Sequence, residues 1–406
     1  MGAGGKQLSI ALVGTRGVPA RYGGFETCVE EVGSRLADRG HSVRVYCRRV
    51  ETADGAEPQE ELASYKGMTL VHQGAMRRRS LETLSHTGLS VGHLLTHRTD
   101  AAIVFNAANS LYLPMLRAAR IPVATHVDGL EWQRAKWGAM GRRYYRFAES
   151  AAVRWSDALI ADAQGIADYY TTEFAAGTRL IAYGAPTVAG ATHRLGELGL
   201  APRGYHLVVA RFEPENHVDT IVDGYRRSDA KLPLVVVGSA PYAEEYTRRV
   251  RALADDRVRF LGGVWDQELL DQLYASAYTY LHGHSVGGTN PSLLRAVGAG
   301  TPTIAYDVPF NSEVLGDAGL YFSAASDLSG TIGFAEAAVE QHAARSTATR
   351  ERAKRYDWDA VADAYEALCS DLVERRAVKP KRPVFGQRVN GQSRLASMAV
   401  PAERTS

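Results

Sequence analysis

The sequence has few cysteines and no long apolar run. Its three cysteines, Cys28, Cys47 and Cys369, lie too far apart to match a disulfide framework or a metal-binding motif. No window reaches about 18 consecutive apolar residues, the length that a membrane-spanning helix needs. Residues 1–7 contain no apolar segment typical of a secretion signal. These absences predict a cytoplasmic protein in a reducing compartment, without a transmembrane segment.

Most of the chain also lacks an excess of positive charge. The formal net charge is +2, but Val378–Ser406 alone contains six Lys or Arg residues and one Glu, which leaves −3 for the rest. Nucleic-acid binding needs a basic surface, so we expect no nucleic-acid partner. The composition of residues 377–406 predicts a disordered basic tail.

Clusters of arginine raise a second hypothesis, peripheral contact with the inner face of an anionic membrane. Besides the tail, the candidate residues are Arg77, Arg78, Arg79, Arg142, Arg143 and Arg146. Each charge near an anionic surface adds ~1 kcal/mol of attraction. A solvated basic face without a membrane partner is the alternative.

The chain does contain a repeated strand–helix pattern. Leu8–Thr15 is an almost continuous apolar run, as expected for a strand buried on both faces. After a glycine-rich loop, Phe25, Val29, Val32 and Leu36 recur at helical spacing. A strand, a helix and a second strand of this length imply a parallel sheet with a right-handed crossover. The other elements expected in this half are strands at His41–Cys47, Ala101–Phe105, Pro122–His126, Ala158–Asp162 and Arg179–Tyr183 and a helix at Tyr144–Trp155.

A second series of strands and helices follows residues 188–204, a segment rich in Gly, Ala and Pro that is typical of a linker. The expected strands are His206–Ala210, Leu234–Gly238, Arg257–Leu261, Tyr278–His282 and Thr303–Tyr306. The expected helices are Val218–Arg227, Tyr242–Ala254, Glu268–Ser276, Ser292–Gly298 and Val361–Leu372. We therefore predict an α/β protein with domains at 1–187 and 205–355 and closing helices at 356–376. Ligands of such sheets bind at the carboxyl ends of the strands, so two facing domains would share a site in the cleft between them.

The first glycine-rich loop, Gly14–Glu26, contains Gly23 and Gly24 just before a predicted helix. The amino end of a helix presents unpaired N–H groups and a positive dipole to an anion such as phosphate. The spacing of the glycines matches neither the dinucleotide-binding fingerprint nor the P-loop. A tight turn without a ligand is the alternative.

The second glycine-rich loop lies in His282–Arg295, where Gly287 and Gly288 precede Thr, Asn and Pro at a predicted helix start. Glycines, hydrogen-bonding side chains and a helix start coincide here, which favours an anion site over a simple turn. For His282 and His284, ordinary packing at the end of a strand is the alternative.

Charged and polar side chains follow two of the predicted strands. Arg211 comes directly after the first strand of the second half, where a guanidinium can clamp a diphosphate. The alternative is a surface ion pair with Glu213 or Glu215. His126 and Asp128 end a strand of the first half, where proton transfer or recognition of sugar hydroxyls is feasible. The alternative is a purely structural role.

Together these segments resemble the GT-B retaining glycosyltransferases, similar to family 4 and most of all to bacterial rhamnosyltransferases of capsule and exopolysaccharide assembly. The stretches that carry the resemblance are VGTRGVPARYGGFET, HVDGLEW, ARFEPEN and HGHSVGGTNPSLL. Two more, GTPTIAYDVPFNSEVLGDAGLYF and RYDWDAVADAYEAL, extend it to about Leu372. The resemblance implies two doubly wound Rossmann-like domains that face a cleft.

The resemblance also implies a reaction. A sugar, expected to be rhamnose, would pass with retention from a nucleoside-diphosphate donor to a saccharide or polyprenyl-linked saccharide, without a metal or other cofactor. Arg211 would hold the donor diphosphate, His126 would lie near the donor sugar and Asp128 near the acceptor. The leaving phosphate oxygen would take the acceptor proton. The donor-binding residues that the resemblance implies are Gly23, Gly24, Gly238, Gly287, Gly288, Thr289, Asn290, Pro291, Ser292, Leu293 and Arg295.

Three positions depart from the family pattern. Many relatives have two glutamates eight positions apart, and these places fall on Gly287 and Arg295. A lysine that accompanies the clamping arginine is replaced by Asn216, and Arg295 is our candidate for the missing positive charge. Two alternatives to an active transferase therefore stay open: a silent subunit that binds a sugar nucleotide, and a sugar-nucleotide epimerase on the same architecture.

Overall fold

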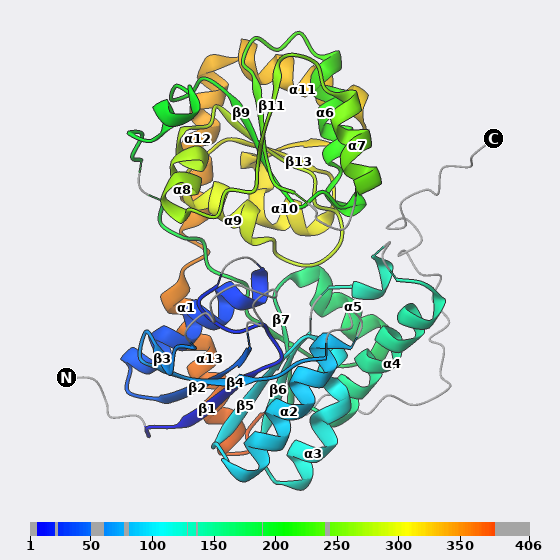
Figure 1. Cartoon of the computed structure of the whole chain (residues 1–406), viewed down its shortest axis with the longest axis vertical. Helices are drawn as coiled ribbons and strands as arrows, with labels where there is room; N and C mark the ends of the chain where they lie inside the picture. The colour runs from blue at the N-terminus through cyan, green and yellow to red at the C-terminus, as the bar shows by residue number, and fades with distance from the viewer. Residues whose placement is uncertain are drawn as a thin grey trace, which may run out of the picture.

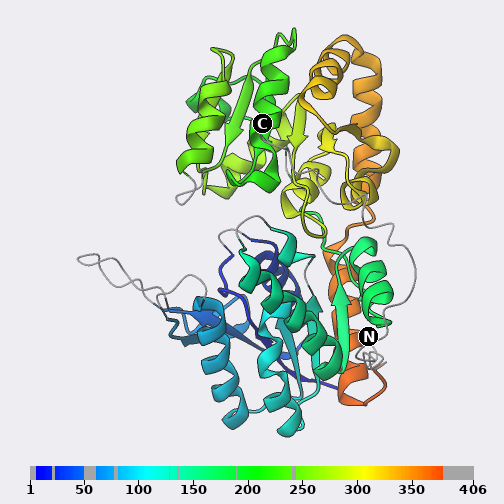
Figure 2. The same cartoon turned by 90° about the vertical axis from the view of Figure 1, so that its right-hand side faces the viewer.

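The structure, a computed structural model, consists of two α/β domains stacked along the long axis of the molecule (Figures 1 and 2). It describes residues 6–20, 23–49, 61–76, 81–127, 129–134, 137–188, 190–239 and 244–377. The predicted catalytic residue Asp128, the basic tail from Val378 and the arginines at positions 77–79 lie outside the described residues.

The first domain contains a sheet in the order β3-β4-β2-β1-β5-β6-β7-β8, in which β3 is antiparallel to β4 and the other described pairings are parallel. Its strands are β1 (Ser9–Val13), β2 (Ser42–Arg48), β3 (Ser64–Tyr65), β4 (Met68–Gln73), β5 (Ala101–Phe105), β6 (Val123–Val127), β7 (Ala158–Ala161) and β8 (Arg179–Leu180). Its helices are α1 (Gly24–Asp38), α2 (Glu82–Thr96), α3 (Leu113–Ala118), α4 (Ala139–Trp155) and α5 (Gln164–Phe174), with short 3-10 helices η1 (Ala107–Tyr112) and η2 (Glu131–Gln133).

The second domain contains a parallel sheet in the order β11-β10-β9-β12-β13-β14. Its strands are β9 (His206–Val209), β10 (Leu234–Val237), β11 (Val258–Gly262), β12 (Thr279–His282), β13 (Thr303–Tyr306) and β14 (Leu320–Phe322). Its helices are α6 (Val218–Arg227), α7 (Glu244–Leu253), α8 (Gln267–Ser276), α9 (Pro291–Gly298), α10 (Pro309–Leu315), α11 (Ala325–Ala337) and α12 (Val339–Ala353), with 3-10 helices η3 (Leu195–Leu198), η4 (Pro214–Asn216) and η5 (Gly316–Ala318).

The apolar run of β1 is explained by burial on both faces of the first sheet. Ile10 and Leu12 join the core that includes the apolar face of α1, and Ala11 and Val13 join the core under α2 and α3. Successive side chains of a strand point to opposite faces, so each face needs its own apolar residues.

The last helix, α13 (Trp358–Val373), returns from the second domain and packs along α1 in the first (Figure 1). Arg35 of α1 pairs with Asp359 at 2.7 Å, and Arg39 pairs with Asp363 at 2.6 Å. Where the chain crosses between the domains in both directions, the N–H of Ala185 donates to the carbonyl of Tyr356 at 2.7 Å. The two crossings therefore lie side by side.

The predicted strands all occur, with ends that differ by a few residues. The sequence analysis did not predict β4 or α2, which lie between β2 and β5. Only one face of β4 is well buried, at Met68 and Leu70, so its apolar signal is short. The polar Ser, His and Thr residues of α2 lie on its buried face, at His86, Thr87 and Ser90, which weakens the helical pattern of apolar residues.

Candidate functional site

The two glycine-rich loops meet where the domains touch. Gly24 is the first residue of α1, and Pro291 is the first residue of α9. A Cβ atom on Gly24 would lie 3.2 Å from Cγ of Pro291 and 3.2 Å from a ring carbon of Tyr183. The amino ends of the two helices thus lie close together across the domain boundary.

Two more glycines allow close contacts at this boundary. One lies against the backbone of the other domain, and the other lies against a carboxylate. A Cβ on Gly129 would lie 2.4 Å from the carbonyl carbon of Gly287, and a Cβ on Gly288 would lie 2.1 Å from Oδ1 of Asp162. The hydroxyl of Thr289 donates to the carbonyl of Asp162 at 2.7 Å. We call the surface formed by these contacts the seam. Its residues are Gly24, Gly129, Asp162, Gly287, Gly288, Thr289 and Pro291.

The start of α9 is capped by its own side chains. Asn290 accepts hydrogen bonds from the N–H of Ser292 at 2.9 Å and from its hydroxyl at 2.7 Å, and the hydroxyl of Tyr280 donates to the Ser292 hydroxyl at 3.1 Å. Leu293 is buried and anchors the helix in the core of its domain. The positive end of the helix dipole therefore lies at a fixed position beside the seam.

The amino end of α1 carries an acidic side chain as well as the predicted glycines. Gly23 precedes the helix with a φ of 114°, a conformation that favours glycine. The Glu26 carboxylate accepts the N–H of Arg16 at 3.0 Å, and Glu30 accepts the N–H of Ala20 at 2.7 Å. These bonds hold the loop against the first turns of the helix.

Arg211 lies just after β9 with its side chain half exposed, and its guanidinium approaches Glu213 at 3.5 Å. This is the surface ion pair that the sequence analysis left open. The positive charge of Arg211 nevertheless reaches the end of β12, because it helps to lower the pKa of His284.

His284 and Asn216 form a buried pair beside Arg211. Nδ1 of His284 lies 2.8 Å from Oδ1 of Asn216, and the amide nitrogen of Asn216 donates to the Arg211 carbonyl at 2.8 Å. Burial, followed by the nearby positive charges of Arg134 and other cations, holds the pKa of His284 well below its usual range. Asn216 stands where the family that this chain resembles has a lysine. Its side-chain oxygen holds the neutral imidazole of His284 in place.

His126 is wholly buried at the end of β6, within an aromatic cluster. Its ring centroid lies 5.2 Å from Phe25, 5.4 Å from Phe105 and 5.7 Å from Tyr183. Burial lowers its pKa to about 3, and in the described part of the chain neither ring nitrogen has a hydrogen-bond partner. This position corresponds to the alternative of a structural role more closely than to a group exposed to a sugar.

Arg295 and Gly238, both predicted to bind the donor, have other roles in this structure. The Arg295 guanidinium points to α8, where it donates to Gln267 at 2.8 Å and approaches Asp271 at 3.2 Å. The expectation that it supplies a missing cation is therefore not supported. A Cβ on Gly238 would lie 1.8 Å from the carbonyl oxygen of Ala210, so strand packing accounts for this glycine.

Asp162 is a seam residue that the sequence analysis did not single out. Burial raises its pKa to about 7, and Oδ1 lacks a hydrogen-bond partner in the described residues. Glu313 of α10 adds negative charge nearby and accepts the N–H of Gln164, at the start of α5, at 2.9 Å. The sequence feature that could have identified it is an acidic residue directly after the apolar strand β7.

The described residues contain neither a metal-binding cluster nor a membrane-spanning helix. No group of three or more His, Cys, Asp or Glu side chains there is arranged to hold a metal ion. Within the same residues, every helix is too short or too polar to cross a membrane.

Comparisons with known proteins agree with this architecture. Residues 203–340 match the family described as glycosyl transferases group 1, and residues 120–186 match a domain family of unknown function, DUF1972. The matched stretch 203–340 contains Arg211, Asn216 and the loop of the seam that precedes α9.

Curated relatives and solved structures also resemble this chain. The O-antigen chain mannosyltransferase B of Escherichia coli is 28% identical over 127 residues, which are 30% of this chain and 33% of that relative. Sucrose-phosphate synthase of Thermosynechococcus elongatus aligns over 91% of this chain and 100% of its own, with a TM-score of 0.78 and 21% identity. Anabaena HepE in complex with UDP-glucose aligns over 90% and 100%, with a TM-score of 0.70 and 18% identity.

The structural matches establish the GT-B fold for this chain, as the resemblance implied. The chain spans a third or less of the length of the curated relatives it matches.

Proposed function

We propose that this protein is a glycosyltransferase that moves a sugar from a nucleoside-diphosphate donor to a saccharide or lipid-linked saccharide in the synthesis of a cell-surface polysaccharide. The observation that carries the proposal is the contact between Gly24 and Pro291. It places two helix amino ends, one from each domain, against each other in a GT-B fold. A diphosphate between them would meet two positive dipole ends.

Arg211 would add a positive charge to the proposed diphosphate site. Its guanidinium is half exposed and, within the described residues, forms one ion pair, with Glu213 at 3.5 Å, so a bound diphosphate can compete for it. Charge on the departing nucleotide would then be stabilised by groups fixed before the reaction starts. No metal enters this scheme.

The state of His126 favours a reaction without a protein base. The imidazole is wholly buried, and burial lowers its pKa to about 3, so it is a weak base without access to an acceptor hydroxyl. We therefore propose that the leaving phosphate oxygen takes the acceptor proton on the same face of the sugar, which retains the configuration at the anomeric carbon.

The seam requires the domains to separate before a donor can enter. Gly288 touches Asp162, and Gly129 touches Gly287, so these loops leave no room for a ligand where they meet. We propose that the domains rotate about the two adjacent crossings, at Ala185 and Tyr356, between an open state and this closed state.

Rhamnose is the donor sugar that we propose to test first, because the motif set resembles rhamnosyltransferases. UDP-glucose, which is present in the HepE complex, and nucleotide-activated mannose, suggested by the mannosyltransferase, are the competing donors. Peripheral contact with an anionic membrane also remains a proposal. Arg146 approaches Glu173 at 3.1 Å and stacks over Trp132, so Arg142 and Arg143 are better placed for that contact.

The decisive experiment measures transfer of radiolabelled sugar from a panel of nucleotide donors onto a polyprenyl-linked saccharide extract. We expect transfer from one donor and a product whose anomeric configuration matches the donor. Absence of transfer from every donor by the folded protein would refute the proposed activity. Thermal-shift screening with the same donors would show separately whether any of them binds.

A silent subunit that binds a sugar nucleotide is the second candidate. Arg295 is held by Gln267 and Asp271, and Gly287 offers no side chain, so neither carboxylate of the family pattern is present. Binding of a donor by calorimetry, together with no turnover on any acceptor, would favour this candidate. Transfer by the purified chain alone would exclude it.

A further inference from the structure

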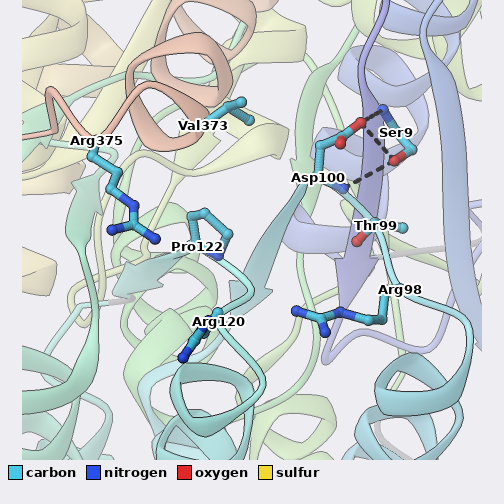
Figure 3. A pocket seen from close by; sticks show the side chains of 8 residues that line it. All are labelled: Ser9, Arg98, Thr99, Asp100, Arg120, Pro122, Val373 and Arg375. Carbon is cyan, nitrogen blue, oxygen red and sulfur yellow. Dashed lines mark hydrogen bonds between the residues drawn. The ribbon is translucent and has the colours of Figure 1, made fainter.

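An open cavity of about 380 Å³ lies at the edge of the first sheet away from the seam (Figure 3). Ser9 begins β1, Asp100 precedes β5 and Pro122 precedes β6, so the cavity lies at the amino ends of these parallel strands. The seam residues follow the carboxyl ends. The lining residues of this cavity, which we call the arginine pocket, are Ser9, Arg98, Thr99, Asp100, Arg120, Pro122, Val373 and Arg375.

Three arginines reach the pocket from three separate parts of the chain. Arg98 follows α2, Arg120 follows α3 and Arg375 follows α13. Figure 3 shows the guanidinium groups of Arg98 and Arg375 extending from opposite sides toward the space beside Pro122. All three arginines are exposed, and within the described residues none of them forms an ion pair with a carboxylate.

The acidic residue in the lining does not neutralise these arginines. The Asp100 carboxylate accepts the N–H of Ser9 at 2.7 Å and its hydroxyl at 2.8 Å. Those hydrogen bonds, assisted by the charge of Lys6, lower the pKa of Asp100. Three arginines and one ionised aspartate leave the lining with a net charge of +2.

The remaining polar groups of the lining are already bonded within the protein. The Thr99 hydroxyl donates to the carbonyl of Ala101 at 3.0 Å, and the Ser9 hydroxyl donates to Asp100. A ligand would therefore be held mainly by guanidinium N–H groups. Guanidinium groups bind phosphate through paired hydrogen bonds, and a bound anion relieves the repulsion among neighbouring cations.

We propose that the arginine pocket binds a phosphate group. The sequence beyond the pocket fits this chemistry, because Arg375 stands three residues before Val378–Ser406, with its six Lys or Arg residues and one Glu. A phosphorylated metabolite and the phosphate of a lipid headgroup share the chemistry that the guanidinium groups recognise. The pocket lies away from the seam, so this inference does not depend on the proposed transferase activity.

The test uses the full chain, inorganic phosphate and phenylglyoxal, a reagent that modifies accessible guanidinium groups. Peptide mass spectrometry would follow modification of the pocket arginines, with the exposed Arg248 and Arg355 of the second domain as internal controls. We expect phosphate near saturation to slow modification of the pocket arginines about 10-fold, because occupancy limits access of the reagent. The controls should react at an unchanged rate.

A second arm separates the two sources of phosphate. Vesicles of phosphatidylcholine, with or without phosphatidic acid, would replace inorganic phosphate in the same assay. Protection by inorganic phosphate indicates a phosphorylated metabolite, and protection by phosphatidic acid vesicles alone indicates a lipid headgroup. Either outcome supports the proposal. Failure of both probes to protect, or equal protection of pocket and control arginines, overturns it.

A matched pair of variants completes the test. Arg120→Ala with Arg375→Ala removes two charges from the pocket, and Arg248→Ala with Arg355→Ala removes two elsewhere. Arg98 is kept because its guanidinium donates to the Ala119 carbonyl. We expect phosphate to protect Arg98 in the control pair and to lose that protection in the pocket pair. Retained protection in the pocket pair, at unchanged thermal stability, contradicts the assignment.

Discussion

Oδ1 of Asn216 lies 2.8 Å from Nδ1 of His284, and both side chains are buried. The Asn216 amide nitrogen donates to the carbonyl of Arg211, so its oxygen faces the imidazole as an acceptor. His284 therefore carries its proton on Nδ1 and stays neutral. In this way one amide links the backbone of the proposed diphosphate clamp to the end of β12.

Replacing Asn216 with Ala should destabilise the protein. The change leaves the buried Nδ1–H of His284 without its partner and removes one of the two hydrogen bonds to the Arg211 carbonyl, which costs roughly 1–3 kcal/mol of unfolding free energy. Urea unfolding at neutral pH measures the effect. Gln267→Ala is the control, because it removes a hydrogen bond from an exposed side chain. Equal stability of the two variants would contradict the importance of the buried pair.

Arg211→Ala should lower kcat/KM by about 100-fold, the usual loss when a fixed group that stabilises developing charge is removed. Arg249→Ala is the matched control. Its guanidinium is also exposed and pairs with a carboxylate, Asp219 at 2.7 Å, on α6. Steady-state kinetics on the donor identified in the panel measure both variants. Activity of Arg211→Ala close to wild type would remove this residue from the mechanism.

Much of the fold could be predicted, because runs of consecutive apolar residues identify the buried strands. Two-sided burial requires continuous apolar strands, and β5, β7 and β10 consist entirely of apolar residues. The glycine loops were equally visible, since a Cβ on Gly288 would collide with Asp162 of the other domain and a Cβ on Gly24 would crowd Pro291. Such close contacts require glycine at the position, so they are visible in the sequence.

The direction of individual side chains was less predictable. The sequence places Arg295 one helical turn inside α9, but only packing decides that its guanidinium reaches Asp271 of α8. His126 ends a strand as predicted, yet Phe25, from a distant segment, helps to close the space around it. Asp162 becomes unusual only when Gly288 covers it. Contacts between distant segments leave no local pattern.

The Asp162 carboxyl should make stability depend on pH. Its pKa is raised from 3.8 to about 7 by burial, so between these values the folded state holds a proton that the unfolded state has released. The unfolding free energy should therefore fall as pH rises through this range, by at most roughly 4 kcal/mol. Asp162→Asn removes the effect. The variant should exceed wild type in stability above pH 7 and match it near pH 4 in chemical denaturation.

Glu149 provides a control for this pH effect. Burial also raises its pKa to about 7, but it lies in α4 and bonds the Tyr169 hydroxyl at 2.8 Å, outside the seam. Glu149→Gln should change stability with the same sign. Donor affinity measured across the same pH range should change its profile in Asp162→Asn alone. If the pH profile of donor affinity is unchanged in both variants, protonation of Asp162 does not control domain closure.

Gly288→Ala should prevent the domains from closing fully. The added methyl carbon would lie 2.1 Å from Oδ1 of Asp162, and the glycine φ is not in the left-handed region, so the collision is the expected cause of any effect. Because a displacement of about 1 Å can cost about 100-fold in rate, we expect kcat/KM to fall by roughly 10- to 100-fold. The radius of gyration from small-angle X-ray scattering should increase.

Gly330→Ala is the control for this prediction, since its Cβ would meet nothing within 4 Å. Adding Asp162→Ala to Gly288→Ala should restore the smaller radius, and failure of this rescue would show that the methyl group acts elsewhere.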